Sequence, residues 1–367
     1  MGTKVILLRS QDVFSDSRVL KYESLLKKEN IPYAIVGWDR KGLNLKRENT
    51  FFYKRRAGFQ EGEKAIVNRV WWTFFLFRFL FMHLKEYQII HACDFDTVLP
   101  SLVMRILGKK VFFDIFDWFS DEVKTGKSWI DKPINLLEKF AVRHSDLVIL
   151  CEKGRLRQIQ CTPKNYIVIP NVPSQLLGQI NSTKIVKENV SWPIVIAYVG
   201  GIVHSRGLLE LVDCISGDDR FVLKIAGFGD SIIENTIKAA AQKYMNINFY
   251  GKVSYDRALE IMRESDILYA MYYKDNANHI YAAPNKFYES IYLNKPVITT
   301  EGTLVGNMVK QYRNGFVISE GKQALSDFLN SLTPQSIYMK KQDMGRIKDW
   351  EKKIQNCFSQ YIKAIND

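Results

Sequence analysis

Short apolar runs recur along the whole chain, and they constrain the fold more than any other feature. Runs of this length, bounded by turn residues and separated by segments with helical spacing, are typical of buried strands in a parallel sheet. Strands that alternate with helices predict an α/β fold with a Rossmann-like unit in each half of the chain. The runs lie at residues 5–8, 31–36, 89–92, 111–113, 147–150 and 167–169, and again at 193–199, 221–226, 247–250, 266–270, 297–300 and 315–318.

The chain is long enough for two domains, and its polarity indicates where they divide. Residues 172–192 are polar and without periodicity, so we predict that they form a linker. The N-terminal domain is then 1–171 and the C-terminal domain 193–345. A final helix over 346–367 carries a wide apolar face, and we expect it to pack back on the N-terminal domain.

Charge is unevenly distributed between the two halves. The first 171 residues contain 29 Lys and Arg against 19 Asp and Glu, whereas the remainder contains 23 against 20. A basic half indicates an acidic partner: anionic lipid, nucleic acid or a phosphorylated substrate. The five cysteines are scattered and show no zinc spacing, which favours a reducing, cytoplasmic compartment. The first apolar run turns polar within a few residues, so we interpret it as a strand rather than a signal peptide.

The segment before the third run is aromatic and basic. Residues 46–64, with Lys54, Arg55 and Arg56, are predicted to be an extended loop, and 66–84 to be a helix about as long as a membrane span. Polar residues interrupt this helix, and the periodicity places Asn68, Arg69 and Arg78 near one face. The helix is therefore either packed in the domain or partly buried in a lipid surface, with a true span as a third interpretation.

The segment Ala283–Ser290 predicts a phosphate site. Pro284 suits the first turn of a helix whose free N–H groups attract phosphate, and Asn285 and Lys286 follow it. Glu289 lies just beyond the first turn, where its carboxylate can accept hydrogen bonds from two hydroxyls, as on a ribose. An ordinary amphipathic helix with a solvated Glu289 is the alternative.

Glycines follow two predicted strands of the second half. Gly200 and Gly201 come directly after residues 193–199, with Arg206 close behind. Such a strand-to-helix turn lets backbone approach a phosphate, which the arginine would neutralise. The alternative is a tight turn with a solvated arginine. A second pair, Gly227 and Gly229, follows residues 221–226.

Acidic residues follow two predicted strands of the first half, at the edge where open α/β sheets bind ligands. Asp94 and Asp96 follow one strand, and Asp117 lies after the next. Asp94-Phe95-Asp96 matches a short metal-binding pattern, but metal needs further oxygen ligands. We expect a capping or substrate-facing role for Asp94, a structural role for Asp96, and no metal.

These segments together resemble the family 4 glycosyltransferases of GT-B fold, and within them the enzymes of bacterial capsule and surface-polysaccharide assembly. The resemblance covers nearly the whole chain. The matching segments are Asp16–Val19, His91–Thr97, Ile169–Asn171, Tyr198–Gly201 with Arg206–Gly207, and Pro284–Thr300.

The resemblance implies two Rossmann-like domains facing a cleft and transfer of a sugar from a nucleoside-diphosphate sugar, with retention of configuration and without metal or other cofactor. It implies a glycan or lipid-linked acceptor, bound by the N-terminal domain, and a peripheral position at the inner face of the plasma membrane. Gly200, Gly201, Arg206, Gly227, Gly229, Asn285, Lys286 and Glu289 would bind the donor.

The sequence departs from the family pattern at three positions. Tyr281 replaces the glutamate expected eight residues before Glu289, and Gly201 replaces the diphosphate arginine. Phe116 replaces the expected histidine, so either Asp94 or Asp117 is catalytic, or the donor phosphate itself acts as the base. Two other functions stay open: a GT-B-like nucleotide-sugar epimerase, and a non-enzymatic binder of an anionic surface or nucleic acid. No nucleic-acid-binding motif is present.

Overall fold

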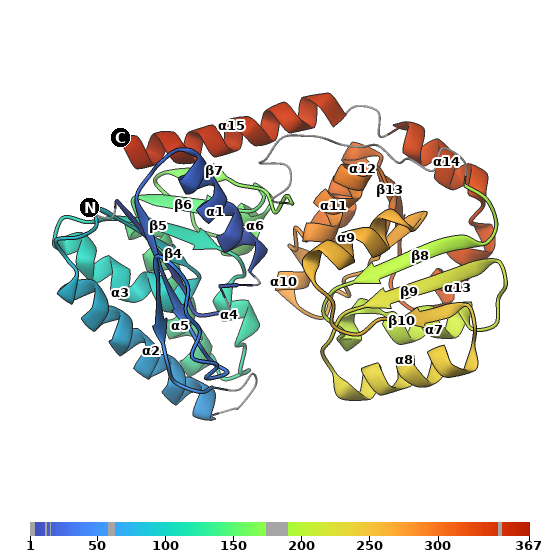
Figure 1. The fold of residues 1–367 in the computed structure, drawn as a ribbon, viewed down its shortest axis with the longest axis horizontal. Helices are drawn as coiled ribbons and strands as arrows, with labels where there is room; N and C mark the ends of the chain where they lie inside the picture. Colours follow the sequence, from blue (N-terminus) through green and yellow to red (C-terminus); the bar gives the residue numbers. More distant parts are fainter. Residues whose placement is uncertain (1–3, 12, 15, 58–62, 174–189, 344–346) are drawn as a thin grey trace. The chain divides into compact units, whose positions relative to one another are not determined.

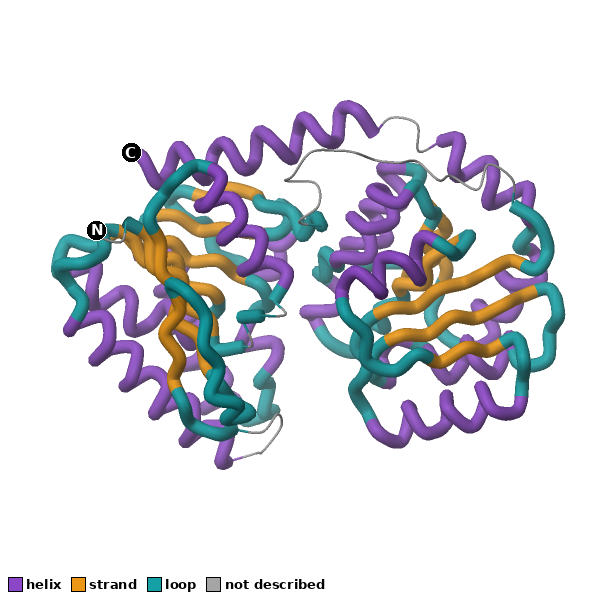
Figure 2. Tube along the Cα trace, viewed as in Figure 1, coloured by secondary structure: helices purple, strands orange, loops and turns teal. Residues whose placement is uncertain are grey.

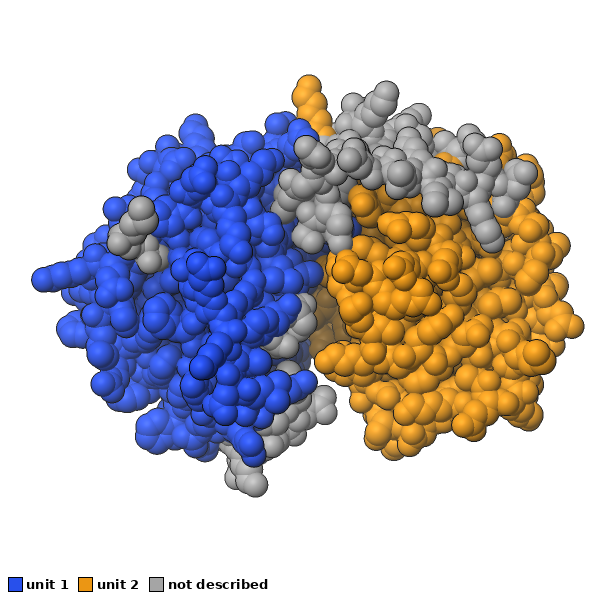
Figure 3. Space-filling view, viewed as in Figure 1, with its two compact units in different colours: residues 1–179, 353–367 blue, residues 180–352 orange. Residues whose placement is uncertain are grey.

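The computed structural model describes residues 4–11, 13–14, 16–57, 63–173, 190–343 and 347–367. Two compact units divide the chain: Met1–Gln179 with Lys353–Asp367, and Ile180–Lys352 (Figure 3). Of the predicted linker, residues 174–189 lie outside the described part. Each unit has its own hydrophobic core and a central parallel sheet between layers of helices (Figure 2). The prediction of two Rossmann-like α/β halves is confirmed.

The N-terminal sheet has the strand order β3-β2-β1-β4-β5-β6-β7 (Figure 1). Its strands are β1 (Val5–Arg9), β2 (Tyr33–Trp38), β3 (Thr50–Tyr53), β4 (Ile89–Cys93), β5 (Lys110–Ile115), β6 (Leu147–Leu150) and β7 (Tyr166–Val168). The helices of this half are α1 (Ser17–Lys28), α2 (Glu63–Met82), α3 (Phe95–Ile106), α4 (Phe119–Glu122), α5 (Ser128–His144) and α6 (Arg155–Ile159).

Chain direction determines which helices share a face of this sheet. The connection β1–α1–β2 steps one way along the sheet, whereas β4–α3–β5 steps the other way. Because such connections are right-handed, α1 and α3 lie on opposite faces. The last helix, α15 (Ile347–Asn366), joins α1: Tyr361 contacts Tyr22, and Phe358 lies under the amine of Lys21. These contacts agree with the predicted return of the final helix to the N-terminal half.

Two expectations for the aromatic segment are wrong. Part of the predicted loop 46–64 is the edge strand β3, which pairs with β2. Its aromatic residues favour a strand more than the surrounding charges favour a loop. The polar residues of α2 do not share a face, because Asn68 is buried against Arg55 whereas Arg78 is exposed. In the described residues, no helix is long and apolar enough to cross a membrane.

The C-terminal sheet has the strand order β10-β9-β8-β11-β12-β13. Its strands are β8 (Ile194–Val199), β9 (Phe221–Ala226), β10 (Ile247–Phe249), β11 (Ile267–Ala270), β12 (Val297–Thr300) and β13 (Gly315–Ile318). Its helices are α7 (Leu208–Ile215), α8 (Ser231–Lys243), α9 (Tyr255–Arg263), α10 (Ala277–Ile280), α11 (Asn285–Leu293), α12 (Leu304–Tyr312), α13 (Lys322–Ser331) and α14 (Pro334–Asp343), with the 3-10 turn η2 (His204–Arg206).

Candidate functional site

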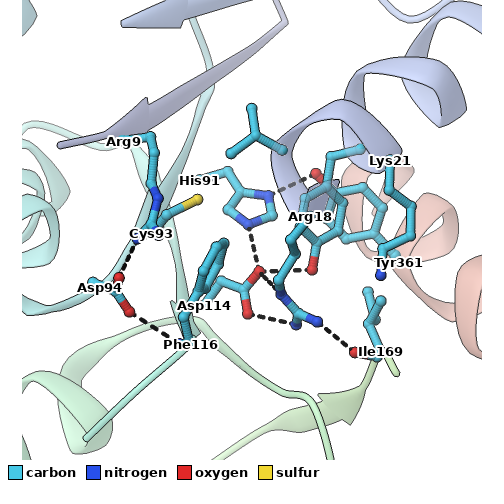
Figure 4. Close-up of polar contacts among 12 residues, drawn as sticks. Arg9, Arg18, Lys21, His91, Cys93, Asp94, Asp114, Phe116, Ile169 and Tyr361 are labelled. Carbon is cyan, nitrogen blue, oxygen red and sulfur yellow. Dashed lines mark hydrogen bonds and ion pairs between the residues drawn. The ribbon is translucent and has the colours of Figure 1, made fainter. Parts of the chain in front are cut away.

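Asp94 lies at the carboxyl end of β4, where it precedes the first residue of α3. Its φ of 70° is rare for a residue with a side chain. The side chain does not cap the helix. Instead it accepts hydrogen bonds from the backbone N–H groups of Phe116, at 3.0 Å, and Asp117, at 3.4 Å, and forms an ion pair with Arg9 (Figure 4). Of the two roles expected for Asp94, capping by the side chain is therefore wrong, and the substrate-facing role stays a prediction. The carboxylate connects the ends of three strands.

The surroundings of Asp94 favour its protonated form. Burial raises the pKa of this carboxyl to about 7, and the nearby carboxylates of Asp117 and Asp96 add to the effect. The guanidinium of Arg9 and the N–H of Phe116 act in the opposite direction. A carboxyl group with a pKa near neutrality can accept and release a proton at physiological pH.

Asp117, the other predicted catalytic residue, lies on the loop after β5. Its carboxylate pairs with Arg155 at 3.1 Å, and its side chain is 60% exposed. The structure therefore brings Asp94 and Asp117 together, since the backbone of one donates to the side chain of the other.

Asp114 is a buried structural carboxylate. It accepts a bidentate pair from Arg18, at 2.9 and 2.7 Å, and further bonds from Tyr22 and His91. The guanidinium of Arg18 holds the pKa of Asp114 well below its usual range, against the effect of burial. Arg18 also donates to the carbonyl of Ile169, so this network joins α1 to the chain beyond β7 (Figure 4).

The same network contains three side chains whose ligand atoms lie close enough to one another to hold a metal ion. They are the group of this kind among the described residues. Ligand atoms of His91, Cys93 and Asp114 lie within 4.8 Å of one another. Both oxygens of Asp114 already accept from Arg18, and both nitrogens of His91 contact Asp114 or Tyr361. A cation there would face a buried guanidinium, so this group does not fit a metal site.

In the C-terminal half, the two glycine turns pack against each other at the ends of β8 and β9. Gly200 and Gly227 have φ angles of 150° and 151°, which residues with a side chain rarely adopt. A Cβ atom on Gly227 would overlap the carbonyl of Gly200, and one on Gly229 would overlap the backbone of Ile202. A Cβ on Gly201 would meet no described atom within 4 Å, so this turn borders open space.

Two cations lie at this turn. Nζ of Lys286 would be 2.5 Å from a Cβ on Gly200, and it lies 4.7 Å from the ring centroid of Tyr198. The guanidinium of Arg206 stacks 4.0 Å above the ring of Tyr272, and its Nη1 is buried without a hydrogen-bond partner among the described residues. Burial lowers the pKa of Lys286 to about 8; the carboxylate of Glu289 opposes this shift, and the charge of Arg206 adds to it. The site therefore holds positive charge that an anion would stabilise.

Glu289 lies one turn into α11 and is buried. Its carboxylate accepts a hydrogen bond of 3.1 Å from the hydroxyl of Tyr255 on α9. Burial raises the pKa of Glu289, while Lys286 and Tyr255 oppose the shift. The alternative of a solvated Glu289 is therefore wrong. Asn285 is the first residue of α11, and Pro284 is the residue before the helix rather than part of its first turn.

Sequence reasoning missed the tyrosines of this site. Tyr198 lies against Lys286, Tyr255 hydrogen-bonds Glu289, and Tyr272 stacks under Arg206. Tyr198 was part of the segment Tyr198–Gly201 that matches the family pattern, but it was given no role. No sequence signal connected Tyr255 or Tyr272 with the helix that begins at residue 285. Tertiary packing brings them together.

Comparison with known proteins is consistent with this geometry. Residues 181–346 match the family described as "Glycosyl transferases group 1". The matched residues include both glycine turns and α11. No curated protein matches the sequence.

Among solved structures, sucrose-phosphate synthase from Thermosynechococcus elongatus is similar, with a TM-score of 0.67 and 14% identity over 99% of this chain and 100% of that one. The Anabaena protein HepE in complex with UDP gives 0.66 and 13%, over 99% of each chain. A Listeria monocytogenes structure described as a UDP-N-acetylglucosamine 2-epimerase gives 0.59 and 10%, over 94% of this chain and 91% of that one.

These structural similarities establish the GT-B type of fold, whereas the family match concerns the half that contains the glycine turns, Lys286 and Glu289. The match thereby confirms the predicted enzyme class. The C-terminal half is a glycosyl transferases group 1 domain, and the protein is a glycosyltransferase.

Proposed function

We propose that the protein transfers a sugar from a nucleoside-diphosphate sugar to a glycan or lipid-linked acceptor, as in the capsule-building members of family 4. The observation that carries this proposal is the position of Lys286 and Arg206 beside a glycine turn that borders open space. Two partly uncompensated cations and the N-terminus of α11 suit a diphosphate. HepE, which shares the fold, binds UDP, so a uridine nucleotide is the first donor to test.

The same residues account for the leaving group. When the bond between the sugar and the diphosphate breaks, negative charge grows on the departing phosphate. Lys286, Arg206 and the N–H groups at the start of α11 would stabilise that charge more strongly in the transition state than in the ground state. Glu289 would hold the nucleotide through the ribose hydroxyls.

The proton of the acceptor hydroxyl must leave as the new bond forms. Asp94 is suited to accept it because its pKa of about 7 lies near physiological pH. Retention would instead let the departing phosphate take the proton, and Asp94 would then orient the acceptor. We further propose that no metal takes part, because the lysine and arginine supply the positive charge that a metal would provide.

We also propose that the enzyme works in the cytoplasm, at the inner face of the membrane that carries its acceptor. The excess of Lys and Arg in the first 171 residues supports this position, and nucleic acid is not among the proposed partners.

Ligand-dependent thermal stability tests the donor assignment. UDP- and GDP-sugars are added to the purified protein, and the donor is the nucleotide sugar that raises the melting temperature, because binding to the native state alone stabilises it. Incubation of that sugar with a membrane extract then tests transfer. Conversion of the sugar nucleotide to its epimer without any acceptor would support the epimerase alternative. The Listeria structure described as an epimerase has a similar fold. The absence of any nucleotide-dependent shift would overturn the proposal.

A further inference from the structure

The helices α2, α3 and α5 form one layer on the N-terminal sheet, on the face opposite α1, because α3 packs against both of the others (Figure 1). More than half of the large apolar side chains that are exposed in the described residues lie on this layer. We call this surface the three-helix face. Its exposed apolar residues are Val67, Val70, Trp71, Phe74, Phe77, Phe81, Met82, Val103, Ile106, Leu107, Trp129, Leu136, Leu137 and Phe140.

Helix α2 is apolar on two opposite sides. Trp72, Leu76 and Leu80 recur every fourth residue and are fully buried against the sheet. Phe74 and Phe81 lie half a turn away at the helical repeat of 100° per residue, and they are 59% and 58% exposed. One apolar stripe is enough to attach a helix to a sheet, so the second stripe is not explained by the fold of this unit.

Helix α5 repeats the pattern. Trp129, Leu136 and Phe140 fall on one exposed stripe, and the exposed side chains of Lys132 and Arg143 lie beside it. On α2, Arg78 lies on the same side as the exposed phenylalanines, and the exposed Lys85 lies in the turn that follows the helix. Two acidic groups near these stripes are engaged locally: Asp131 of α5 accepts from the backbone of Thr125 and Gly126, and Glu86, in the turn after α2, contacts His83.

We infer that the three-helix face docks on the surface of an anionic lipid bilayer. Aromatic side chains bordered by lysine and arginine are suited to the boundary between headgroups and acyl chains. Lysine and arginine near anionic lipid add an electrostatic attraction to the burial of apolar side chains. The inference rests on the proposed function and deepens it by assigning a surface to the membrane-bound acceptor side.

Charge also distinguishes a bilayer from a second copy of the chain. In a symmetric dimer the same patch occurs on both partners. The basic residues of one copy would then face those of the other, in a protein whose formal charge is +13. Anionic lipid removes this repulsion.

Vesicle sedimentation tests the inference with the full-length protein. Vesicles of phosphatidylcholine with phosphatidylglycerol should sediment the wild type at low salt, and pure phosphatidylcholine should bind it weakly. A variant with Phe74→Ser, Phe81→Ser, Leu136→Ser and Phe140→Ser should lose about tenfold or more in partitioning. Lys132→Glu with Arg143→Glu should lose binding to anionic vesicles only. Ile232→Ser with Met245→Ser, which removes exposed apolar residues from the C-terminal half, is the matched control and should bind as wild type.

Nucleotide-induced stabilisation of each variant shows whether it is folded, and it separates this inference from the donor proposal. Loss of vesicle binding with intact nucleotide binding supports the three-helix face. Wild-type protein that ignores anionic vesicles at low salt overturns it, whatever nucleotide binds. Equal binding by the four-serine variant and the wild type also overturns it. A concentration-dependent dimer in sedimentation velocity that the serine substitutions dissociate, without vesicle binding, would assign the face to self-association instead.

Discussion

At the scale of single residues, Glu289 and Arg206 bear most directly on the donor. Both lie at the carboxyl edge of the C-terminal sheet, and both are supported by a tyrosine that sequence patterns did not connect with them. Removal of Glu289 should change nucleotide affinity, because its carboxylate would hold the ribose. Removal of Arg206 should change the rate, because its guanidinium would meet negative charge that develops during the reaction.

Glu289→Gln should weaken nucleotide-sugar binding and leave the fold intact. The substitution keeps the shape of the side chain but removes the charge that strengthens its hydrogen bonds to ribose hydroxyls, a loss of roughly 1.5–3 kcal/mol. Titration calorimetry of the purified variant measures the affinity. Tyr255→Phe, which removes the supporting hydroxyl, should have a smaller effect. An unchanged Kd in Glu289→Gln would exclude this carboxylate from the donor site.

Arg206→Ala should reduce turnover more than it reduces stability. The guanidinium stacks on Tyr272 and has a buried nitrogen without a hydrogen-bond partner among the described residues, so part of its hydrogen-bonding capacity is available to a ligand. Removal of a group that stabilises charge in the transition state costs about 10²–10³ in kcat. Rates and melting temperatures are compared with those of Arg206→Lys, which retains the charge. Parallel losses of rate and stability would indicate a structural arginine.

The raised pKa of Asp94 predicts opposite pH trends for activity and stability. If its ionised form accepts a proton, the rate should rise as pH increases through about 7. Its pKa in the folded protein lies above the value of 3.8 for a free side chain, so the folded state binds more protons between these two values. The free energy of unfolding should therefore fall as pH rises from about 4 to about 7.

Asp94→Asn should abolish both trends, as measured by a pH–rate profile and by denaturant unfolding at several pH values. A flat rate profile in the wild type between pH 6 and 8 would instead support the departing phosphate as the base.

At the scale of elements, the sequence predicted most of the fold. Strands with continuous apolar runs, such as β1 and β12, were found because burial on both faces leaves a clear pattern. The edge strand β3 was missed because it is short and lies among charged residues. Its pairing with β2 depends on the sheet, and no local signal reports that.

Residues of the candidate site likewise divide into those with a local sequence signal and those whose role depends on tertiary packing. Gly200, Gly227 and Lys286 could be predicted as site residues because glycine turns and a helix start leave local signatures in the sequence. From the sequence, Asp94 was named as a candidate and Asp114 was given no role. Both are aspartates that follow apolar residues, and only the packing of Arg9 and Arg18 distinguishes the carboxylate with a raised pKa from the structural one.

At the scale of the whole molecule, transfer activity should not depend on a metal ion in either unit. Treatment with EDTA should leave transfer activity largely intact. Lys286 and Arg206 supply positive charge at the proposed diphosphate site, and the His91–Cys93–Asp114 group is filled by Arg18. Activity is measured before and after dialysis against EDTA, with re-addition of Mg²⁺ or Mn²⁺ as the control. Loss of activity that either ion restores would contradict metal-independent transfer.

The separate cores predict that the two units can be destabilised independently. Arg18→Met leaves Asp114 buried without its ionic partner, which costs about 3–5 kcal/mol, and it removes the hydrogen bond to Ile169. Scanning calorimetry of this variant should show a lower melting temperature for the N-terminal unit. The matched control is Arg220→Met, which breaks an exposed pair with Asp218 in the other unit and should cost less than about 1 kcal/mol.

The donor nucleotide completes this test, because its proposed contacts all come from the C-terminal unit. Its addition to Arg18→Met should raise the transition of that unit by the same amount as in the wild type. The weakened N-terminal transition should stay where the substitution left it. If the nucleotide instead raises both transitions together, the two units unfold cooperatively, and donor binding then stabilises the acceptor half as well.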